Sequence, residues 1–299
     1  MKVLACSDGS EHGTKALALA GRIAIANRAA VTVFGVTESE AQEETVYAGL
    51  RRALKDFERD GINVELVTKG GDPVEEIVKR THETNYDLVV IGARRRATER
   101  GAILAAKAYR IIEAIEPPVL VAVGDDRELK RLLVCTQGGA CIETAVQFTG
   151  QLARSLSATV TLLTVLPNLG GIHVGLLRRE ADAEALLRSN SALARDLRAE
   201  KRNLEASGVQ VGVRLRYGLV TEEILKELVE GNHDLVVVGA CPDPNAWRRY
   251  LIGNVTREVV HRADRPVLVV RSERAFLSVR QRIGRAIRRA VRAVQGRHR

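Results

Sequence analysis

Two groups of residues in this 299-residue sequence have the types and spacing of an anion-binding site. The first is Ser7-Asp8-Gly9-Ser10, in which a carboxylate and a glycine turn follow an apolar run and Ser10 can cap the next helix. The second is Gly253-Asn254-Val255-Thr256, in which a glycine, the unpaired N–H groups of a helix start and the Thr256 hydroxyl suit a phosphate. Turn and cap chemistry alone is the competing interpretation, and in isolation it ranks first for the group around Asp8.

Catalytic residues do not occur in a familiar arrangement. The sequence has no Ser/His/Asp set, no pair of carboxylates at catalytic spacing, no HxxH-type metal motif and no Walker Gly-Lys-Ser/Thr. His12 beside Glu11 is the one general-base candidate, and a place on an exposed first helical turn explains it better. The six histidines are scattered, without the close pairing that zinc needs, so no metal site is expected. We therefore expect a protein that is not an enzyme.

The elements that would position these residues occur twice. Residues 3–9 match residues 132–138 at an offset of 129, and residues 87–93 match residues 234–240 at an offset of 147. Because the offset grows by 18, the second copy contains about 18 additional residues between its second and third strands.

Each copy alternates short β-branched runs with longer helical patterns. In the first copy we expect strands near 2–6, 31–36, 63–67, 87–91 and 118–123, and helices near 11–27, 41–60, 73–84 and 100–115. The strands are apolar on both faces, which is typical of strands buried between helix layers. This alternation predicts an α/β protein with two tandem doubly wound parallel-sheet domains. Ligands bind such sheets beyond the carboxyl ends of the strands, usually between the first and fourth.

The pattern of both copies together resembles the universal stress protein (UspA) family. The segments that carry the resemblance are 3–12, 71–73, 88–92 and 118–121 in the first copy and 235–239, 253–256 and 266–270 in the second. The resemblance is to a tandem member, with domains at 1–126 and 127–271 followed by a segment at 272–299. It implies a fold of the adenine nucleotide α-hydrolase-like type, with strand order 3-2-1-4-5 in each domain. It also implies that the two domains pair within one chain through their fifth strands, and assembly into a homo-oligomer stays open.

Members that bind ATP have an Asp after the first strand and a Gly-x2-Gly-x9-Gly-Ser/Thr loop after the fourth. In the first copy Arg95 replaces the second glycine, and Ala105-Ala106 replace the final pair. In the second copy Gln137 replaces the Asp and Pro242 replaces the second glycine. The residues that the resemblance assigns to a site for ATP or another adenine nucleotide are Asp8, Val36, Gly92 and Arg95 in the first copy and Val165, Gly239, Gly253, Asn254 and Thr256 in the second.

These replacements have physical consequences for phosphate binding. A side chain at a glycine position adds a Cβ where backbone must approach phosphate, and Pro242 has no N–H to donate. Arg94-Arg95-Arg96 could bind an anion through side chains instead, although a solvated basic loop explains them equally well. We expect ATP binding to be weakened or lost in the first copy. In the second copy, binding of ATP at an altered site stays open.

The net charge of +9 belongs to the end of the chain. Residues 271–299 contain ten arginines and one acid, Glu273, whereas the remainder has equal numbers of basic and acidic residues. Apolar residues recur at three- and four-residue steps from Phe276 to Val294, which predicts a basic amphipathic helix within 272–299. We rank docking on an anionic membrane surface or a protein partner above nucleic acid, and packing on the chain's own domains is the structural alternative.

Composition limits the remaining choices. An aromatic content of 3% argues against base-stacking platforms. The sequence has no membrane-spanning apolar run and no signal peptide, so we expect a cytoplasmic protein, and peripheral association with the inner membrane surface stays open. The cysteines form no CxxC pair, and Cys6 and Cys135 fit small buried hydrophobes. The leading hypothesis is a non-catalytic stress-response module with an altered adenine-nucleotide site. The alternative is an interaction scaffold that has lost nucleotide binding and docks on a membrane, transporter or nucleic acid through the basic helix.

Overall fold

The computed structural model describes residues 1–93, 95–98, 101–104, 106–124, 127–139, 142–167, 179–240 and 253–272. The first half contains β1 (Lys2–Ser7), α1 (Glu11–Asn27), β2 (Ala30–Thr37), α2 (Glu40–Arg59), β3 (Val64–Gly70), α3 (Pro73–Glu83), β4 (Leu88–Gly92), β5 (Arg95–Thr98), β6 (Gly101–Leu104), α4 (Ala106–Ala114) and β7 (Val119–Ala122). The second half contains β8 (Arg131–Cys135), α5 (Glu143–Leu156), β9 (Thr159–Leu166), α6 (Arg179–Arg188), α7 (Ala192–Ala206), β10 (Val211–Tyr217), α8 (Val220–Glu230), β11 (Leu235–Ala240), α9 (Asn254–Arg262) and β12 (Val267–Arg271).

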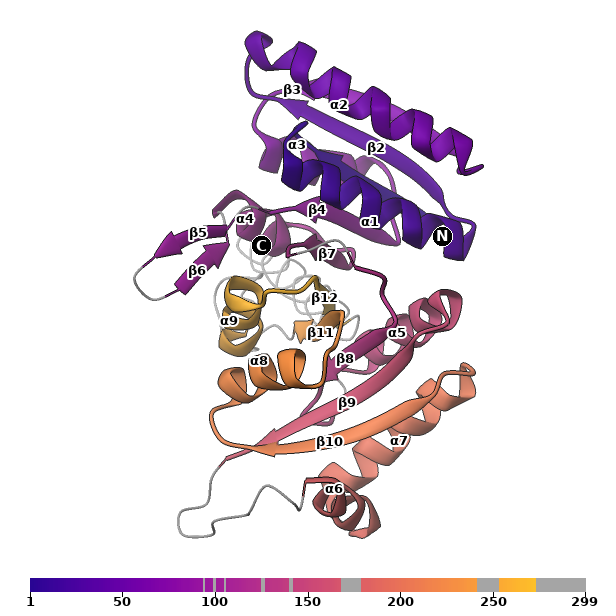
Figure 1. Cartoon of the computed structure of the whole chain (residues 1–299), viewed down its shortest axis with the longest axis vertical. Coiled ribbons are helices and arrows are strands. Elements are labelled where there is room, and N and C mark those ends of the chain that lie inside the picture. Colours follow the sequence, from indigo (N-terminus) through magenta and orange to yellow (C-terminus); the bar gives the residue numbers. More distant parts are fainter. Residues whose placement is uncertain are drawn as a thin grey trace, which may run out of the picture.

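One ten-stranded sheet runs through both halves, in the order β10-β9-β8-β11-β12-β7-β4-β1-β2-β3 (Figure 1). Each half has the order 3-2-1-4-5, which confirms the predicted doubly wound fold. The halves meet where β7 pairs antiparallel with β12, with Leu120 opposite Leu268, and the other neighbouring strands of this sheet are parallel. Pairing through the fifth strands is therefore confirmed.

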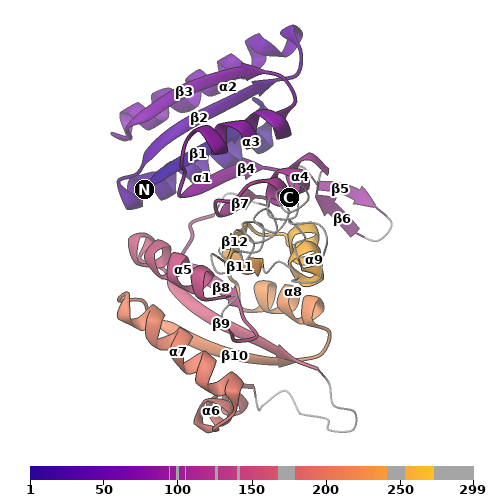
Figure 2. The same cartoon turned by 180° about the vertical axis from the view of Figure 1, so that it is seen from behind.

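Two hydrophobic cores cover the two faces of the sheet along its length. In β1, Val3 and Ala5 belong to the core beneath α1, α2, α5 and α7, whereas Leu4 and Cys6 belong to the core beneath α3, α4, α8 and α9. The views in Figures 1 and 2 show helices on both sides of the sheet in each half. Because inner strands such as β1 and β4 are buried on both faces, their sequences show continuous apolar runs instead of alternation. The outer strands β3 and β10 are partly exposed.

Side-chain caps set the starts of two helices at the ends of strands. The Ser10 hydroxyl accepts a hydrogen bond from the Gly13 N–H, at 3.2 Å, where α1 begins. Asp72 caps α3 by accepting from the N–H groups of Val74 and Glu75, and Pro73 occupies its first turn.

The sequence prediction was wrong between β4 and α4. We expected a helix from about residue 100, but α4 begins at Ala106, and residues 95–98 and 101–104 form an antiparallel hairpin, β5–β6. Gly101, a poor helix former, pairs with Thr98 at the closed end of this hairpin. The hairpin projects from the first half (Figure 1), and β6 contacts α9 of the second half.

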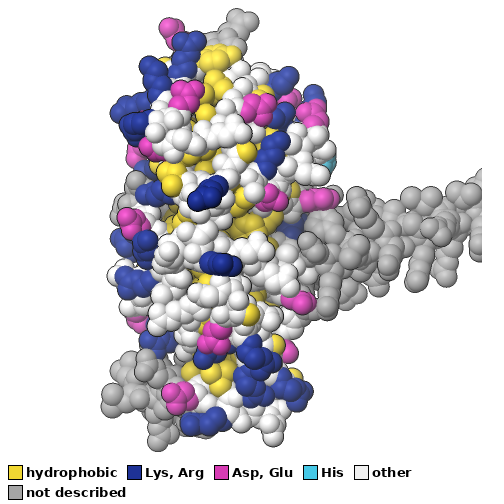
Figure 3. Space-filling model, turned by 90° about the vertical axis from the view of Figure 1, so that its right-hand side faces the viewer, with side chains coloured by type: hydrophobic (Ala, Val, Ile, Leu, Met, Phe, Trp, Pro, Cys, Tyr) yellow, Lys and Arg dark blue, Asp and Glu magenta, His cyan; other side chains and the backbone are white. Residues whose placement is uncertain are grey.

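The additional residues of the second copy contribute α6, which packs against β10 and α7. The amphipathic helix predicted for 272–299 lies outside the described residues, apart from Ser272, as do Cys141 and Cys241. On the face drawn in Figure 3, basic and acidic side chains are interspersed, in keeping with the balanced charge of the sequence before residue 271.

Candidate ligand pocket at the carboxyl edge of the first domain

A cavity of about 800 Å³ lies beyond the carboxyl ends of β1, β2 and β4. These strands are neighbours, with β1 paired to β2 on one side and to β4 on the other, so the residues that follow them converge. The cavity has a buried apolar floor and a polar rim. The floor includes Phe34, Val36, Val46, Ile77, Ile91 and Ile111, and the rim includes Asp8, Ser10, His12, Glu38 and Lys107.

The carboxylate of Asp8 lies exposed on this rim and also shapes the turn. Its Oδ1 accepts a hydrogen bond from the Ser10 N–H at 3.0 Å, and the Ser7 hydroxyl accepts one from the Gly9 N–H at 3.2 Å. Gly9 has a φ of 75°, a left-handed conformation that favours glycine. The turn chemistry considered from the sequence is therefore present, and it uses one lone pair of a carboxylate that lines the cavity.

Gly92 is a packing requirement at the end of β4. A Cβ built on it would lie 2.1 Å from the main-chain oxygen of His12, so the strand end lies directly against the start of α1. From the sequence, we expected this glycine to allow phosphate to approach the backbone. In the structure, it allows the end of β4 to approach the start of α1. Arg95 begins β5 and pairs with Leu104 in the hairpin.

An ion pair between Glu38 and Lys107 at the rim was missed from the sequence. Lys107 is the second residue of α4, and its Nζ lies 2.6 Å from each carboxylate oxygen of Glu38, which follows β2. Both side chains are about half exposed. Comparison of the two copies gave an indication of this pair, because both charged residues are replaced together in the second copy, by Pro167 and Val255.

In the second domain, the corresponding polar side chains donate to main-chain oxygens of that domain. The Gln137 side-chain amide donates to the main-chain oxygen of Val165 at 2.8 Å. The Thr256 hydroxyl is buried and donates to the main-chain oxygen of Gly239 at 2.9 Å. Gly253 caps α9, and a Cβ on it would enter open space, while Asn254 is exposed as the first residue of the helix. The loop between β11 and Gly253 lies outside the described residues.

Below this edge of the second domain lies a buried carboxyl group that sequence reasoning also missed. Glu200 of α7 is 6% exposed, and its Oε1 accepts a hydrogen bond from the Thr136 hydroxyl at 3.0 Å. Its Oε2 is buried without a hydrogen-bond partner. Burial raises the pKa of Glu200 to about 7. The matching position in the first copy is the apolar Ala53, so the comparison of the copies again contained the signal.

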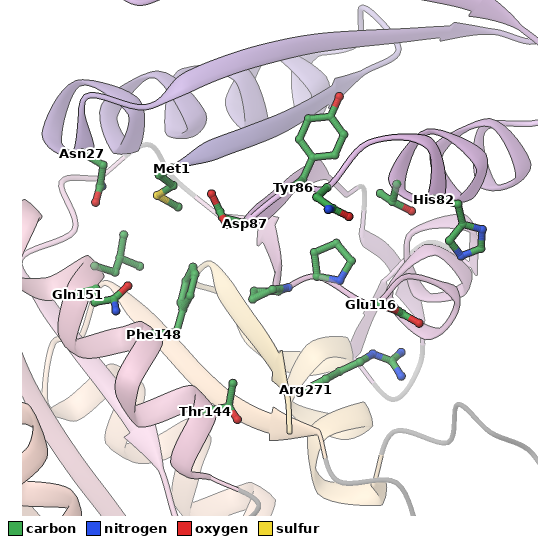
Figure 4. A pocket seen from close by; sticks show the side chains of 15 residues that line it. Met1, Asn27, His82, Tyr86, Asp87, Glu116, Thr144, Phe148, Gln151 and Arg271 are labelled. Carbon is green, nitrogen blue, oxygen red and sulfur yellow. The ribbon is translucent and has the colours of Figure 1, made fainter. Parts of the chain in front are cut away.

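A second cavity, of about 830 Å³, lies on the seam between the domains. Figure 4 shows Phe148 and Gln151 of α5 on one side and residues of the first domain, including Asp87, on the other. It lies at the amino ends of β4 and β7, opposite the edge where doubly wound sheets bind ligands. The Asp87 carboxylate accepts from the Lys2 N–H at 2.7 Å, and Arg271 donates to the main-chain oxygens of Ile112 and Glu113. These bonds give both charged groups a structural role.

Metal binding and thiol chemistry have little support within the described residues. No group of three or more His, Cys, Asp or Glu there could hold a metal ion. Cys6 and Cys135 are free, and burial raises the pKa of both thiols well above the ordinary value, which keeps them unreactive. Across the part of the chain that the structure describes, no helix combines the length and apolar character needed to cross a membrane.

Comparisons with known proteins agree with the fold. The family description "Universal stress protein family" matches residues 1–122 and 128–271. The curated universal stress protein Slr1230 of Synechocystis sp. is 25% identical over 240 residues, which cover 79% of this chain and 75% of the relative. A universal stress protein of Archaeoglobus fulgidus DSM 4304 aligns with a TM-score of 0.69 at 19% identity, over 91% of this chain and 98% of that chain. A universal stress protein crystallised in complex with cAMP aligns with 49% of this chain and 100% of its own, at 21% identity and a TM-score of 0.36.

Proposed function

Because the chain belongs to the universal stress protein family, we propose that it is a stress-response regulatory protein whose first domain binds an adenosine-type ligand. The cavity beyond β1, β2 and β4 is the observation that carries this proposal. Its floor of buried Phe34, Val36 and Ile91 suits a flat heteroaromatic ring, and the exposed Asp8 carboxylate suits ribose hydroxyl groups, which are donors.

We propose that the first domain binds the ligand better than the second, which is the opposite order from the one expected from the sequence. Gly253, Asn254 and the Thr256 hydroxyl favoured the second domain, whereas the described hydrogen bonds support the first. In the second domain the Val165 oxygen already accepts from Gln137, and the donor of Thr256 is already used by Gly239. A ligand there would compete with bonds that the chain makes with itself. We propose that the second domain acts mainly as the structural partner of the first, joined to it through β7 and β12.

We further propose that the protein acts by binding and not by catalysis. The two described serines of the cavity have turn and cap roles, because Ser7 accepts from the Gly9 N–H and Ser10 accepts from the Gly13 N–H. Neither contact activates a nucleophile, which would require a base that accepts the hydroxyl proton.

Isothermal titration of the full chain with adenosine tests the proposed site. We expect one ligand per chain and at least a tenfold weaker affinity in the Asp8→Ala variant, since a hydrogen bond to a charged group is worth about 1.5–3 kcal/mol. The matched control is Asp87→Ala, which removes the same side chain from the opposite edge of the same sheet. Affinity that falls in the Asp87 variant and not in the Asp8 variant, or no binding at 1 mM adenosine, about the weak end of specific affinities, would contradict the proposal.

A further inference from the structure

We propose that Glu38 makes the first-domain pocket selective for adenosine-type ligands that have no phosphate group or a single one, and disfavours di- and triphosphates. This inference rests on the proposed function, because it concerns the charge of the ligand that the same pocket accepts. It is carried by the ion pair that Glu38 forms with Lys107 on the rim of the cavity.

Lys107 is the single lysine or arginine among the described residues that line the cavity. Its place in the first turn of α4 would suit a phosphate, because the N–H groups of a helix start and a nearby ammonium both favour an anion. The Glu38 carboxylate holds that ammonium with two contacts of 2.6 Å and so lies where a phosphate oxygen would have to go. A phosphate must therefore displace Glu38 before it can use Lys107.

The other charges of the described lining do not attract polyphosphate. Glu11 is paired with Lys15 at 3.0 Å, just as Glu38 is paired with Lys107. With both pairs balanced, Asp8 is the carboxylate without a basic partner among the described residues of the lining. A triphosphate brings several negative charges toward this carboxylate and toward the displaced Glu38, and like charges at short range repel. A neutral ribose hydroxyl, in contrast, gains a hydrogen bond from Asp8.

Close approach of phosphate to the backbone is also less open in the first copy than in the family loop, because Ala105-Ala106 stand in place of Gly-Ser and each adds a Cβ. The side of Gly92 that lacks a Cβ lies against the main chain of His12. The second copy has Pro167 and Val255 at the positions of Glu38 and Lys107. The carboxylate that controls the lysine is thus a feature of the first domain alone.

The test is a titration series on the full chain at one fixed low salt concentration, with adenosine, AMP, ADP and ATP as probes. In the unmodified protein we expect affinity to fall from adenosine to ATP by at least tenfold. The Glu38→Gln variant frees Lys107, so ATP affinity should rise at least tenfold while adenosine affinity changes less than threefold. The double variant Glu38→Gln/Lys107→Ala should lose this gain. Glu44→Gln, which removes an exposed carboxylate from α2 outside the lining, is the matched control and should leave the series unchanged.

The outcomes separate this inference from the function beneath it. Failure of adenosine, AMP, ADP and ATP alike to bind either protein contradicts the proposed function itself. Adenosine binding with ATP equal or tighter in the unmodified chain leaves the proposed function standing and overturns the inference, and it would favour Arg94-Arg95-Arg96 as the phosphate ligands. An unchanged ratio of ATP to adenosine affinity in Glu38→Gln likewise overturns it.

Discussion

Replacing the buried carboxyl group of Glu200 by an amide should remove a pH dependence from the stability of the second domain. The Glu200→Gln variant keeps the oxygen that accepts from Thr136 and cannot ionise. Burial raises the pKa of Glu200 to about 7 in the folded protein, against 4.5 for an unperturbed glutamate. Between these values the folded state holds a proton that the unfolded state has lost, so the free energy of unfolding falls as pH rises through this range.

The size of the effect follows from the shift. One pKa unit corresponds to about 1.4 kcal/mol, so a shift from 4.5 to about 7 sets an upper value near 3 kcal/mol at pH 8. Some relaxation around the ionised carboxylate lowers this, and we expect about 2 kcal/mol. At pH 5 the folded unmodified protein and the folded Glu200→Gln variant are both uncharged at this position, so their free energies of unfolding should differ little.

Urea denaturation at pH 5, 6, 7 and 8, at constant ionic strength, measures the difference in the free energy of unfolding between the variant and the unmodified protein. Relative to the unmodified protein, Glu200→Gln should gain about 2 kcal/mol between pH 5 and pH 8. Glu205→Gln on the exposed side of the same helix is the control, and its difference should stay flat. A difference for Glu200→Gln that is constant across the series would refute the reasoning, because it would mean that the carboxyl group titrates alike in both states.

Three further substitutions, one of them with a matched control, test the packing and polar contacts. Gly92→Ala should lower the free energy of unfolding by about 2–3 kcal/mol in urea denaturation, because its Cβ meets the His12 oxygen. Gly253→Ala places its Cβ in open space and should cost less, about 1 kcal/mol, because alanine caps a helix less well than glycine. Arg271 of the second domain donates hydrogen bonds of 2.6 and 2.8 Å to the end of α4 in the first domain. Arg271→Ala removes these bonds and should lower the free energy of unfolding by about 2 kcal/mol in urea denaturation. A much smaller loss would contradict the role of Arg271 in holding the two domains together. Arg216 is a buried guanidinium that pairs with Glu223 and Glu227. Arg216→Ala leaves these buried carboxylates with only Lys226 and His233 as partners, respectively, and should cost about 3–5 kcal/mol at pH 7 in urea denaturation. Stability unaffected by the change would contradict a stabilising role for these buried ion pairs.

Much of the fold could be predicted because it depends on local patterns repeated twice. Strands such as residues 3–6 and 88–91 are apolar at every position, and that pattern alone indicates burial on both faces. The hairpin β5–β6 was not predictable in the same way. Its first strand, Arg95–Thr98, has no apolar pattern, and the short apolar run of its second strand, Gly101–Leu104, fits a helix as well as a strand. The backbone pairing of the two strands and the contact of β6 with α9 decided between them.

The candidate site could be located but not described from the sequence. The order of strands places residues after β1 and β4 at one edge, so Asp8 and Gly92 were found. The contact between Glu38 and Lys107 joins residues that are 69 positions apart, and no local pattern predicts it. Likewise, the sequence shows that Gln137 replaces an Asp, but only the structure shows that its amide bonds to Val165.

Hydrogen exchange of the full chain, with and without saturating adenosine, tests the central claim most directly, because it shows which domain holds the ligand. We predict slower exchange in segments 7–13 and 34–38, which follow β1 and end β2, and unchanged exchange in 136–139 and 163–166 of the second domain. Protection confined to the second domain, or to segments 82–87 and 144–152 that line the cavity between the domains, would contradict the account.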